Sequence, residues 1–187
     1  MTPEQRAVYD KIVSGPRGRL VGPLRAALLI PDLADAWQQF GAQLRYGTTL
    51  PRKITELAIL CVGRYYNSQV EWFIHAREAQ SAGVEPDVVD AIHKRRVPDF
   101  AEAADRIAYE YTRQLLMHGD VDEALHDQAK RLWDATGVVE LTAVVGYYAM
   151  VSMTLNAQAI PTPDGSSPLD FDTDDDGRPR LAALPEA

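Results

Sequence analysis

Residues 52 to 63 read Arg-Lys-Ile-Thr-Glu-Leu-Ala-Ile-Leu-Cys-Val-Gly, and this stretch decides the fold. A helix drawn through it is apolar on most sides, whereas a surface helix carries a polar face opposite its apolar stripe. Such a helix needs neighbours around nearly its whole circumference. The stretch therefore predicts a core helix at the centre of the domain.

The next helix is expected directly after it. Asn67 or Ser68 should interrupt the first helix, and residues 68 to 75 read Ser-Gln-Val-Glu-Trp-Phe-Ile-His. This second helix should run to Ala82, because Gly83 is suited to the left-handed conformation that ends many helices. The two segments together predict a helical hairpin.

Helical periodicity continues through most of the chain. No segment alternates apolar and polar residues as a half-buried strand does, so a sheet is not expected. The fold is predicted to be all-α. Further helices are expected near residues 3–13, 23–30, 32–46, 88–93, 100–118, 122–136 and 138–156.

The domain organisation follows from length and from a change in composition. A chain of 187 residues suits one packed domain and is short for two. Residues 161–187 are acidic, rich in proline and almost free of periodicity. We therefore expect one domain over residues 1–160 and a tail over 161–187 that is extended or packs loosely on a neighbour.

Charge and composition exclude several kinds of partner. The formal net charge is −8, and nucleic-acid binding needs a clustered basic face. No uncharged apolar run is long enough to span a bilayer, so no membrane partner is expected. The first residues are charged and lack the apolar core of a targeting peptide. A cytoplasmic protein is predicted.

Cys61 is the only cysteine, which excludes an intramolecular disulfide and a dithiol redox pair. Leu60 and Val62 flank it in the core helix. We expect a buried, unreactive thiol.

The candidate catalytic residues are Glu56, Glu71 and His75. On a helix, Glu71 and His75 lie one turn apart on the same face, so a carboxylate and an imidazole meet there. Glu56 lies among apolar residues, and a buried carboxylate must be paired, hydrogen-bonded or protonated. If it reaches across the hairpin, Glu56 can complete a proton relay with His75.

Each of these residues also has a purely structural interpretation. Ser68 and Glu71 have the spacing of a capping box, in which both side chains bond the first helical turn. His75 could be an ordinary hydrogen-bonded core histidine. Glu56 could belong to an exposed polar stripe together with Arg52. A capping role for Glu71 is compatible with one in orienting His75.

A short internal similarity links two parts of the chain. Ile54-Thr-Glu-Leu-Ala is followed by Gly63-Arg-Tyr-Tyr, and Val139-Glu-Leu-Thr-Ala is followed by Gly146-Tyr-Tyr. The match suggests two related helical hairpins.

At Glu56, at the Tyr-Asn-Ser turn of residues 66–68 and at Glu71-Trp-Phe-Ile-His75, the chain resembles the carboxymuconolactone decarboxylase family, which includes the alkyl hydroperoxidase D-like proteins. The resemblance covers residues 22–31 and 50–83, and more weakly continues to residue 156. It implies an orthogonal or antiparallel helical bundle that forms a homo-oligomer, as a dimer, trimer or hexamer.

The hydroperoxidase branch of that family uses a glutamate, a Cys-x-x-Cys pair and a histidine. The matching positions here are Glu56, Ser68, Glu71 and His75, so both redox cysteines are absent. Cys61 lies too far along the chain to replace them without a rearranged helix. The chain looks more like the decarboxylase branch.

The resemblance then implies a cofactor-independent lyase that acts on a small cyclic carboxylate or lactone. His75 would donate the proton, Glu56 would tune or relay it, and Glu71 would fix the orientation of the ring. The substrate pocket would be lined by Tyr65, Tyr66, Ser68 and Trp72. Neither a metal ion nor an organic cofactor is expected.

Two alternatives remain open from the sequence. One is an alkyl hydroperoxidase-like antioxidant activity of the peroxiredoxin type. The other is a non-catalytic helical oligomer that binds a small ligand in the same pocket.

Overall fold

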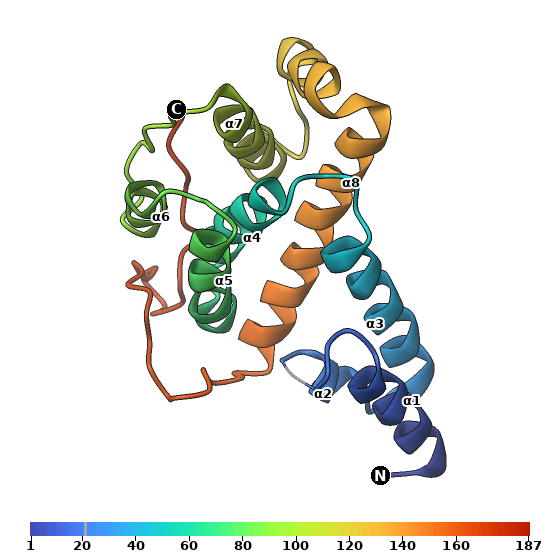
Figure 1. Cartoon of the computed structure of the whole chain (residues 1–187). Helices are drawn as coiled ribbons and strands as arrows, with labels where there is room; N and C mark the ends of the chain where they lie inside the picture. The colour runs from blue at the N-terminus through green and yellow to red at the C-terminus, as the bar shows by residue number, and fades with distance from the viewer. Residues whose placement is uncertain (21) are drawn as a thin grey trace.

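The computed structural model describes residues 1–20 and 22–187, and their secondary structure is helical with an irregular C-terminal segment (Figure 1). In this part of the chain no β-strand forms, and the one β-like feature is an isolated bridge between Thr173 and Pro179. The prediction of an all-α fold is confirmed. The helices are α1 (Pro3–Ser14), α2 (Leu24–Ala27), α3 (Pro31–Tyr46), α4 (Arg52–Tyr65), α5 (Gln69–Ser81), α6 (Pro86–His93), α7 (Ala103–His118) and α8 (Glu123–Ala157).

Helix α4 is the centre of the molecule, as its sequence predicts. Every residue from Ile54 to Arg64 is buried. The helix packs against α5, α7 and α8, so its apolar surface is covered from several sides (Figure 1). Glu56 is carried into the interior because it lies on this helix.

The segment labelled α8 consists of two helices joined at a kink, as the sequence predicts. Asp134 has φ 53° and ψ −169° inside it, and its Oδ1 accepts hydrogen bonds from the backbone N–H groups of Thr136, at 2.6 Å, and Gly137, at 3.3 Å. This carboxylate caps the second half of the helix. The predicted helices at 122–136 and 138–156 are therefore real, but they join at Asp134 without an intervening loop.

One face of the second half of α8 is apolar and exposed. Helix α8 is long and apolar enough to cross a membrane, but half of its most apolar window is buried inside this domain, where it packs on α4 and α7. Its outer face carries Val139, Met150 and Met153, which are 68%, 36% and 50% exposed.

Helices α1 and α2 pack on α3, which in turn packs on α8 (Figure 1). Helix α1 begins with a capping box between Thr2 and Gln5. On α3, Gly41 permits a close approach of α8, because a Cβ atom there would overlap the Tyr147 hydroxyl oxygen. This contact fixes the position of Tyr147.

The chain after α8 runs back over α5, α4 and α7 in an irregular path (Figure 1). Its apolar residues Leu169, Ala182 and Leu184 are buried. Hydrogen bonds also tie it to the helices: the Ala182 N–H donates to the Tyr65 carbonyl at 2.8 Å, and the Tyr109 hydroxyl donates to the Pro185 carbonyl at 2.7 Å. The segment is extended, but it is held to the helices of its own chain along its length, so the expectation of loose packing on a neighbour is wrong.

Candidate active site

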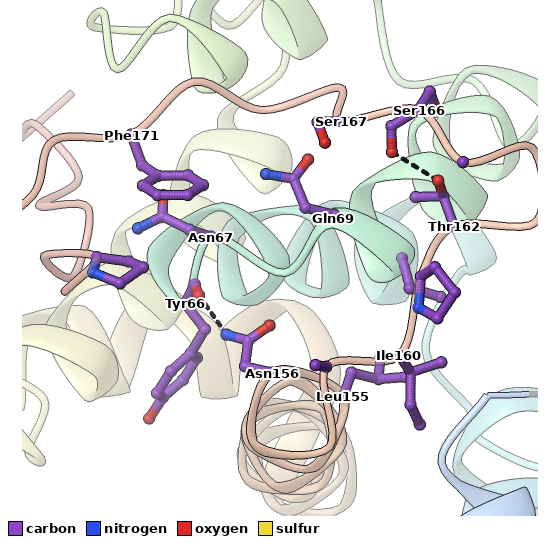
Figure 2. Close-up of a pocket in the computed structure, with 15 residues that line it drawn as sticks. Tyr66, Asn67, Gln69, Leu155, Asn156, Ile160, Thr162, Ser166, Ser167 and Phe171 are labelled. Carbon is purple, nitrogen blue, oxygen red and sulfur yellow. Dashed lines mark hydrogen bonds between the residues drawn. The ribbon is translucent and has the colours of Figure 1, made fainter. Parts of the chain in front are cut away.

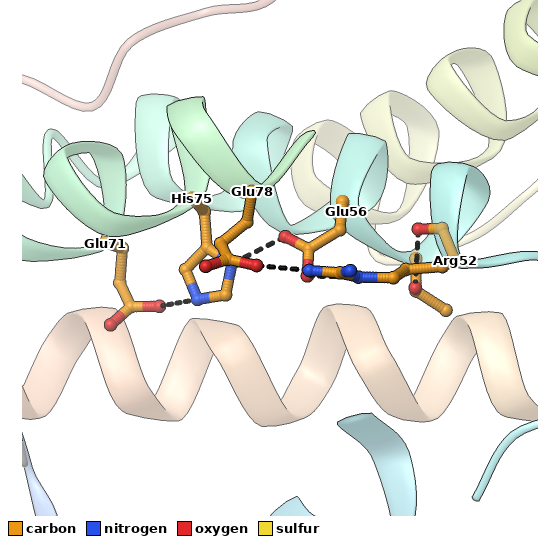
Figure 3. Close-up of polar contacts among 6 residues, drawn as sticks. Arg52, Glu56, Glu71, His75 and Glu78 are labelled. Carbon is orange, nitrogen blue, oxygen red and sulfur yellow. Dashed lines mark hydrogen bonds and ion pairs between the residues drawn. The ribbon is translucent and has the colours of Figure 1, made fainter. Parts of the chain in front are cut away.

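Glu56 and His75 meet in the interior, between α4 and α5. Glu56 Oε2 lies 2.7 Å from His75 Nδ1, and each side chain is 3% exposed (Figure 3). At this distance the pair forms a strong hydrogen bond with little competition from water. The structure therefore brings together the two residues that the relay hypothesis requires.

Glu71 lies on the other side of the same imidazole. Its Oε2 atom is 3.4 Å from His75 Nε2, one helical turn away on α5 (Figure 3). That contact has ion-pair distance, but Glu71 Oε2 has no hydrogen-bond partner within the described chain. The imidazole is thus enclosed between two carboxyl groups, only one of which it firmly binds.

Arg52 continues the network toward the surface. Its Nε atom lies 4.0 Å from Glu56 Oε1, and its guanidinium group also pairs with Glu78 (Figure 3). Glu56 is 2% exposed, so the interpretation of Glu56 as part of an exposed stripe is wrong. The buried carboxylate is compensated by Arg52 on one side and His75 on the other.

Burial gives Glu71 a different protonation equilibrium from that of an ordinary glutamate. Removal from water raises the pKa of Glu71, although His75 and Arg45 partly oppose this effect. If the Nδ1–H of His75 donates to Glu56, the Nε2 atom is free to exchange a proton with Glu71. One proton can then be shared between Nε2 and the Glu71 carboxyl group.

Two tyrosines of α8 complete the surroundings of His75. The Tyr148 ring lies edge-on to the imidazole with centroids 5.2 Å apart, and Tyr147 packs on Tyr148 at 5.3 Å. Burial raises the pKa of both phenols, so both remain protonated at neutral pH. The sequence offered a signal for them in the repeated Gly-Tyr-Tyr pattern, but our prediction placed the other tyrosine pair at the site.

A small cavity of about 50 Å³ opens beside Glu71 and His75. Two arginines that the sequence did not single out, Arg17 and Arg45, face it. No local pattern marks them, because they come from the α1–α2 connection and from the end of α3. The cavity is lined by Arg17, Gly22, Pro23, Leu24, Arg45, Glu71, Ile74, His75, Tyr147, Tyr148 and Val151.

None of the four predicted pocket residues lines this cavity, although Tyr66 lines a larger hollow described below. The Trp72 ring packs 5.3 Å from the ring of His93, and Tyr65 stacks edge-on with Tyr66 at 5.1 Å. Ser68 is fully buried just before α5. None of Tyr65, Tyr66, Ser68 and Trp72 lines the cavity, because they lie at the junction of α4 and α5 or on another face of α5.

The capping-box prediction for Ser68 and Glu71 is also wrong. Ser68 has extended backbone angles, φ −76° and ψ 101°, but its side chain caps no backbone N–H of α5. Its hydroxyl group is buried without a hydrogen-bond partner among the described residues. Glu71 points to His75, which explains why it does not close the reciprocal bond to Ser68.

A larger hollow of about 440 Å³ lies between the start of α5, the end of α8 and the C-terminal segment (Figure 2). Its amide side chains already bind this chain: Asn67 donates to the Arg180 carbonyl, Gln69 bonds Leu169, and Asn156 donates to the Tyr66 carbonyl. No acidic, basic or histidine side chain is among the described residues that line it. The smaller cavity at His75 is the better candidate for chemistry.

Cys61, the one cysteine of the chain, is poorly placed to act as a nucleophile. Cys61 is 0% exposed, and burial strongly raises the pKa of its thiol. The prediction of a buried thiol is confirmed. In the described part of the chain, histidine, cysteine and acidic side chains form no group of three that could hold a metal ion.

Comparison with known proteins supports the fold. No protein-family model and no curated protein matches this sequence. Among solved structures, the debrominase Bmp8 is similar, both in its apo form and as a cysteine-to-alanine variant in complex with 2,3,4-tribromopyrrole. For each, the TM-score is 0.64 at 15% sequence identity, over 89% of this chain and 88% of the other. The chain thus has an all-α helical-bundle fold similar to that of Bmp8.

Proposed function

We propose that this protein is a cofactor-independent enzyme, similar to carboxymuconolactone decarboxylases, that transfers a proton to a small cyclic carboxylate or lactone. The observation that carries the proposal is the 2.7 Å contact between Glu56 and His75, with Glu71 at the opposite ring nitrogen. A buried imidazole between two carboxyl groups is suited to move a proton.

The proposed step breaks the bond between the substrate ring and a carboxylate. The electron pair of that bond passes into the conjugated lactone carbonyl, which becomes an enolate, and carbon dioxide leaves. The proton shared by Glu71 and His75 Nε2 then neutralises the enolate at carbon. Glu56 stabilises the imidazolium form of His75 while the site recovers a proton from water.

Glu71 takes a larger role here than the sequence suggested. Its carboxyl group faces the cavity and burial raises its pKa, so it can hold a proton at a higher pH than an ordinary glutamate. A protonated carboxyl group can act as the acid while His75 returns the proton to it. Orientation of the ring comes from the bond with Glu56 instead.

Thiol chemistry is the weaker alternative. The fold neighbour is a debrominase, and its complex with the bromopyrrole was solved for a variant in which alanine replaces a cysteine. In this chain Cys61 lies in the core and is absent from the cavity lining. An antioxidant function of the peroxiredoxin type has no accessible thiol to support it.

The direct test is turnover of 4-carboxymuconolactone and related lactones, followed by loss of lactone absorbance and release of carbon dioxide. The wild type should turn over at least one of them. His75→Gln, Glu56→Gln and Glu71→Gln should each lower kcat by about 10²- to 10⁴-fold, as expected for loss of a general acid or base. His118→Gln and Glu123→Gln are exposed controls and should retain activity.

Three results would count against the proposal. Activity that survives all three site substitutions would remove the roles of the network. Saturable binding without turnover would favour the non-catalytic ligand-binding oligomer. Peroxide consumption that disappears in Cys61→Ser would favour the antioxidant alternative.

We also propose that the protein forms a homo-oligomer through the exposed face of α8. From Ala135 to Ala157 the helix contains one charged residue, Glu140. The Glu140 carboxylate accepts a hydrogen bond from the Thr49 hydroxyl group. An uncharged, partly exposed helical face of this length is typical of a surface that another chain covers.

A further inference from the structure

Two arginines face the cavity at His75 without a direct ion pair, although Glu56 and Glu78 act on Arg45 from a distance and help to raise its pKa. Arg17 and Arg45 both line the cavity, and among the described residues neither guanidinium group forms a salt bridge. Both arginines act on Glu71, since each lowers the pKa of its carboxyl group. Burial has the larger effect and raises the pKa of Glu71 above its ordinary value.

Buried hydrogen-bond donors without an acceptor lie close to this cavity. Arg17 Nε is buried without an acceptor among the described residues, and its Nη2 atom makes only a long contact of 3.5 Å with the Tyr147 hydroxyl. The Trp37 indole N–H is also buried and makes no hydrogen bond of good geometry in the described chain, although it lies close enough to the Tyr147 hydroxyl to lower the pKa of that phenol. Buried donors are normally satisfied, so these groups indicate a missing acceptor.

The absence of a side chain at Gly41 leaves room for Arg17 and Tyr147 beside the cavity. A Cβ atom at Gly41 would overlap both the Tyr147 hydroxyl oxygen and Arg17 Nη2. Any larger residue would have to displace both groups. Gly41 therefore allows Arg17 and Tyr147 to keep their positions.

The size of the cavity limits what can occupy it. A volume of about 50 Å³ accommodates a group of three or four heavy atoms, since a single water needs about 10–15 Å³ on this measure. A carboxylate fits and a ring does not. A second hollow of about 530 Å³ shares Gly22 and Ile74 with the cavity. Its lining includes the apolar residues Phe73 and Ile160, and also Arg19 and Arg25.

We propose that Arg17 and Arg45 bind the carboxylate of an amphipathic organic acid, whose apolar body lies in the adjoining hollow beside Phe73 and Ile160. This assignment rests on the proposed function and specifies its substrate class. The bound carboxylate is retained during the reaction, because two guanidinium groups stabilise it in the ground state. The bond that breaks therefore belongs to a second carboxyl group of the substrate.

Binding of simple acids to the full-length protein tests this directly. By isothermal titration calorimetry, cyclohexanecarboxylate should bind about 10- to 100-fold more tightly than cyclohexanecarboxamide, as expected for charge-assisted bonds. Acetate, which lacks the apolar body, should bind at least about 10-fold more weakly than cyclohexanecarboxylate. Equal affinity of the acid and the amide in the wild type would overturn the proposal, with no variant needed.

Variants locate the binding groups. Arg17→Gln and Arg45→Gln should each reduce affinity for the acid by about 10-fold or more and leave that for the amide unchanged. Arg17→Lys and Arg45→Lys keep the positive charge and should retain part of the preference for the acid over the amide. This comparison distinguishes loss of the charge from loss of the folded structure. Arg77→Gln removes an exposed arginine of α5 and should change nothing. Unchanged acid affinity in both Gln variants would overturn the assignment.

The proposed arginine site and the proposed decarboxylase function can be disproved independently of each other. Selective acid binding without turnover of any lactone or acid would keep the arginine site and overturn the decarboxylase proposal. Turnover that is independent of Arg17 and Arg45 would keep the decarboxylase proposal and overturn the arginine site.

Discussion

Glu56 and His75 are separated by 19 residues in the chain, yet Glu56 Oε2 and His75 Nδ1 lie 2.7 Å apart in the interior. A short connection between α4 and α5 returns the chain so that the two helices pack together. The hydrogen bond therefore joins the two helices of the hairpin as well as the two groups of the proposed relay.

The first prediction concerns the energy of this bond. Glu56→Gln and His75→Leu should each lower the free energy of unfolding by about 1–3 kcal/mol, because each leaves a buried polar partner unsatisfied. Their effects should be non-additive, with a coupling energy of about 0.5–3 kcal/mol in a double-mutant cycle from urea denaturation.

A surface pair of equal length provides the control for that cycle. Lys11 Nζ and Asp35 Oδ2 also lie 2.7 Å apart, but Lys11 is 58% exposed. The coupling between Lys11→Ala and Asp35→Ala should be below about 1 kcal/mol, because water screens exposed pairs. If Glu56 and His75 couple no more strongly than this pair, burial does not strengthen their contact.

The second prediction is a pH dependence caused by Glu71. Its pKa is raised in the folded protein above the ordinary value of 4.5, so the folded state holds this proton more tightly than the unfolded state. The associated stability is complete below pH 4.5 and is lost as the pH rises through the folded-state pKa. Relative to wild type, Glu71→Gln should therefore become more stable as the pH increases from about 4 to 8.

Urea denaturation of the two proteins across that range measures the difference. An exposed control, Glu123→Gln, should stay parallel to wild type. A constant difference between wild type and Glu71→Gln at every pH would show that the Glu71 pKa is not raised.

The third prediction is that the Cys61 thiol is unreactive in the folded protein. A thiol reagent should label it only after unfolding, because the side chain is 0% exposed and burial raises its pKa. Cys61→Ala should retain catalytic activity within about twofold, since a change in the core costs stability before it alters a distant site. Rapid labelling in buffer without denaturant would contradict the burial of this thiol.

The fourth prediction concerns the C-terminal segment. Leu184 is 3% exposed and Leu181 is 56% exposed, although they are close neighbours in the chain. Leu184→Ala should lower the free energy of unfolding by about 2–5 kcal/mol. Leu181→Ala should change it by less than about 0.5 kcal/mol. Equal, small effects of the two substitutions would mean that the segment does not pack on the domain in solution.

The fifth prediction tests self-association. In sedimentation velocity the wild type should be larger than the 20.7 kDa of one chain. Val139→Glu and Met153→Glu should shift it toward the monomer, because a charge on this face would be buried between subunits. Leu181→Glu, on an exposed residue outside α8, should leave the assembly intact. A monomeric wild type would overturn the proposed homo-oligomer.

The sequence determined the helical class and the hairpin at the centre of the fold. Residues 52–63 are apolar around most of the helix, so local composition alone required a covered core helix. The spacing of Glu71 and His75 by one turn also follows from helical geometry. These features depend on neighbours in the chain, and they were predictable for that reason.

The tertiary structure decided what surrounds His75. Helix α8 delivers Tyr147 and Tyr148, whereas the similar pair at residues 65–66 lies outside the cavity. Arg17 and Arg45 reach the cavity because α3 packs on both α1 and α8. Local sequence cannot specify which distant helix packs on a given face, since packing depends on shape and burial across the whole domain. The sequence identified the proposed proton-transfer residues, and only the packing placed the arginines beside them.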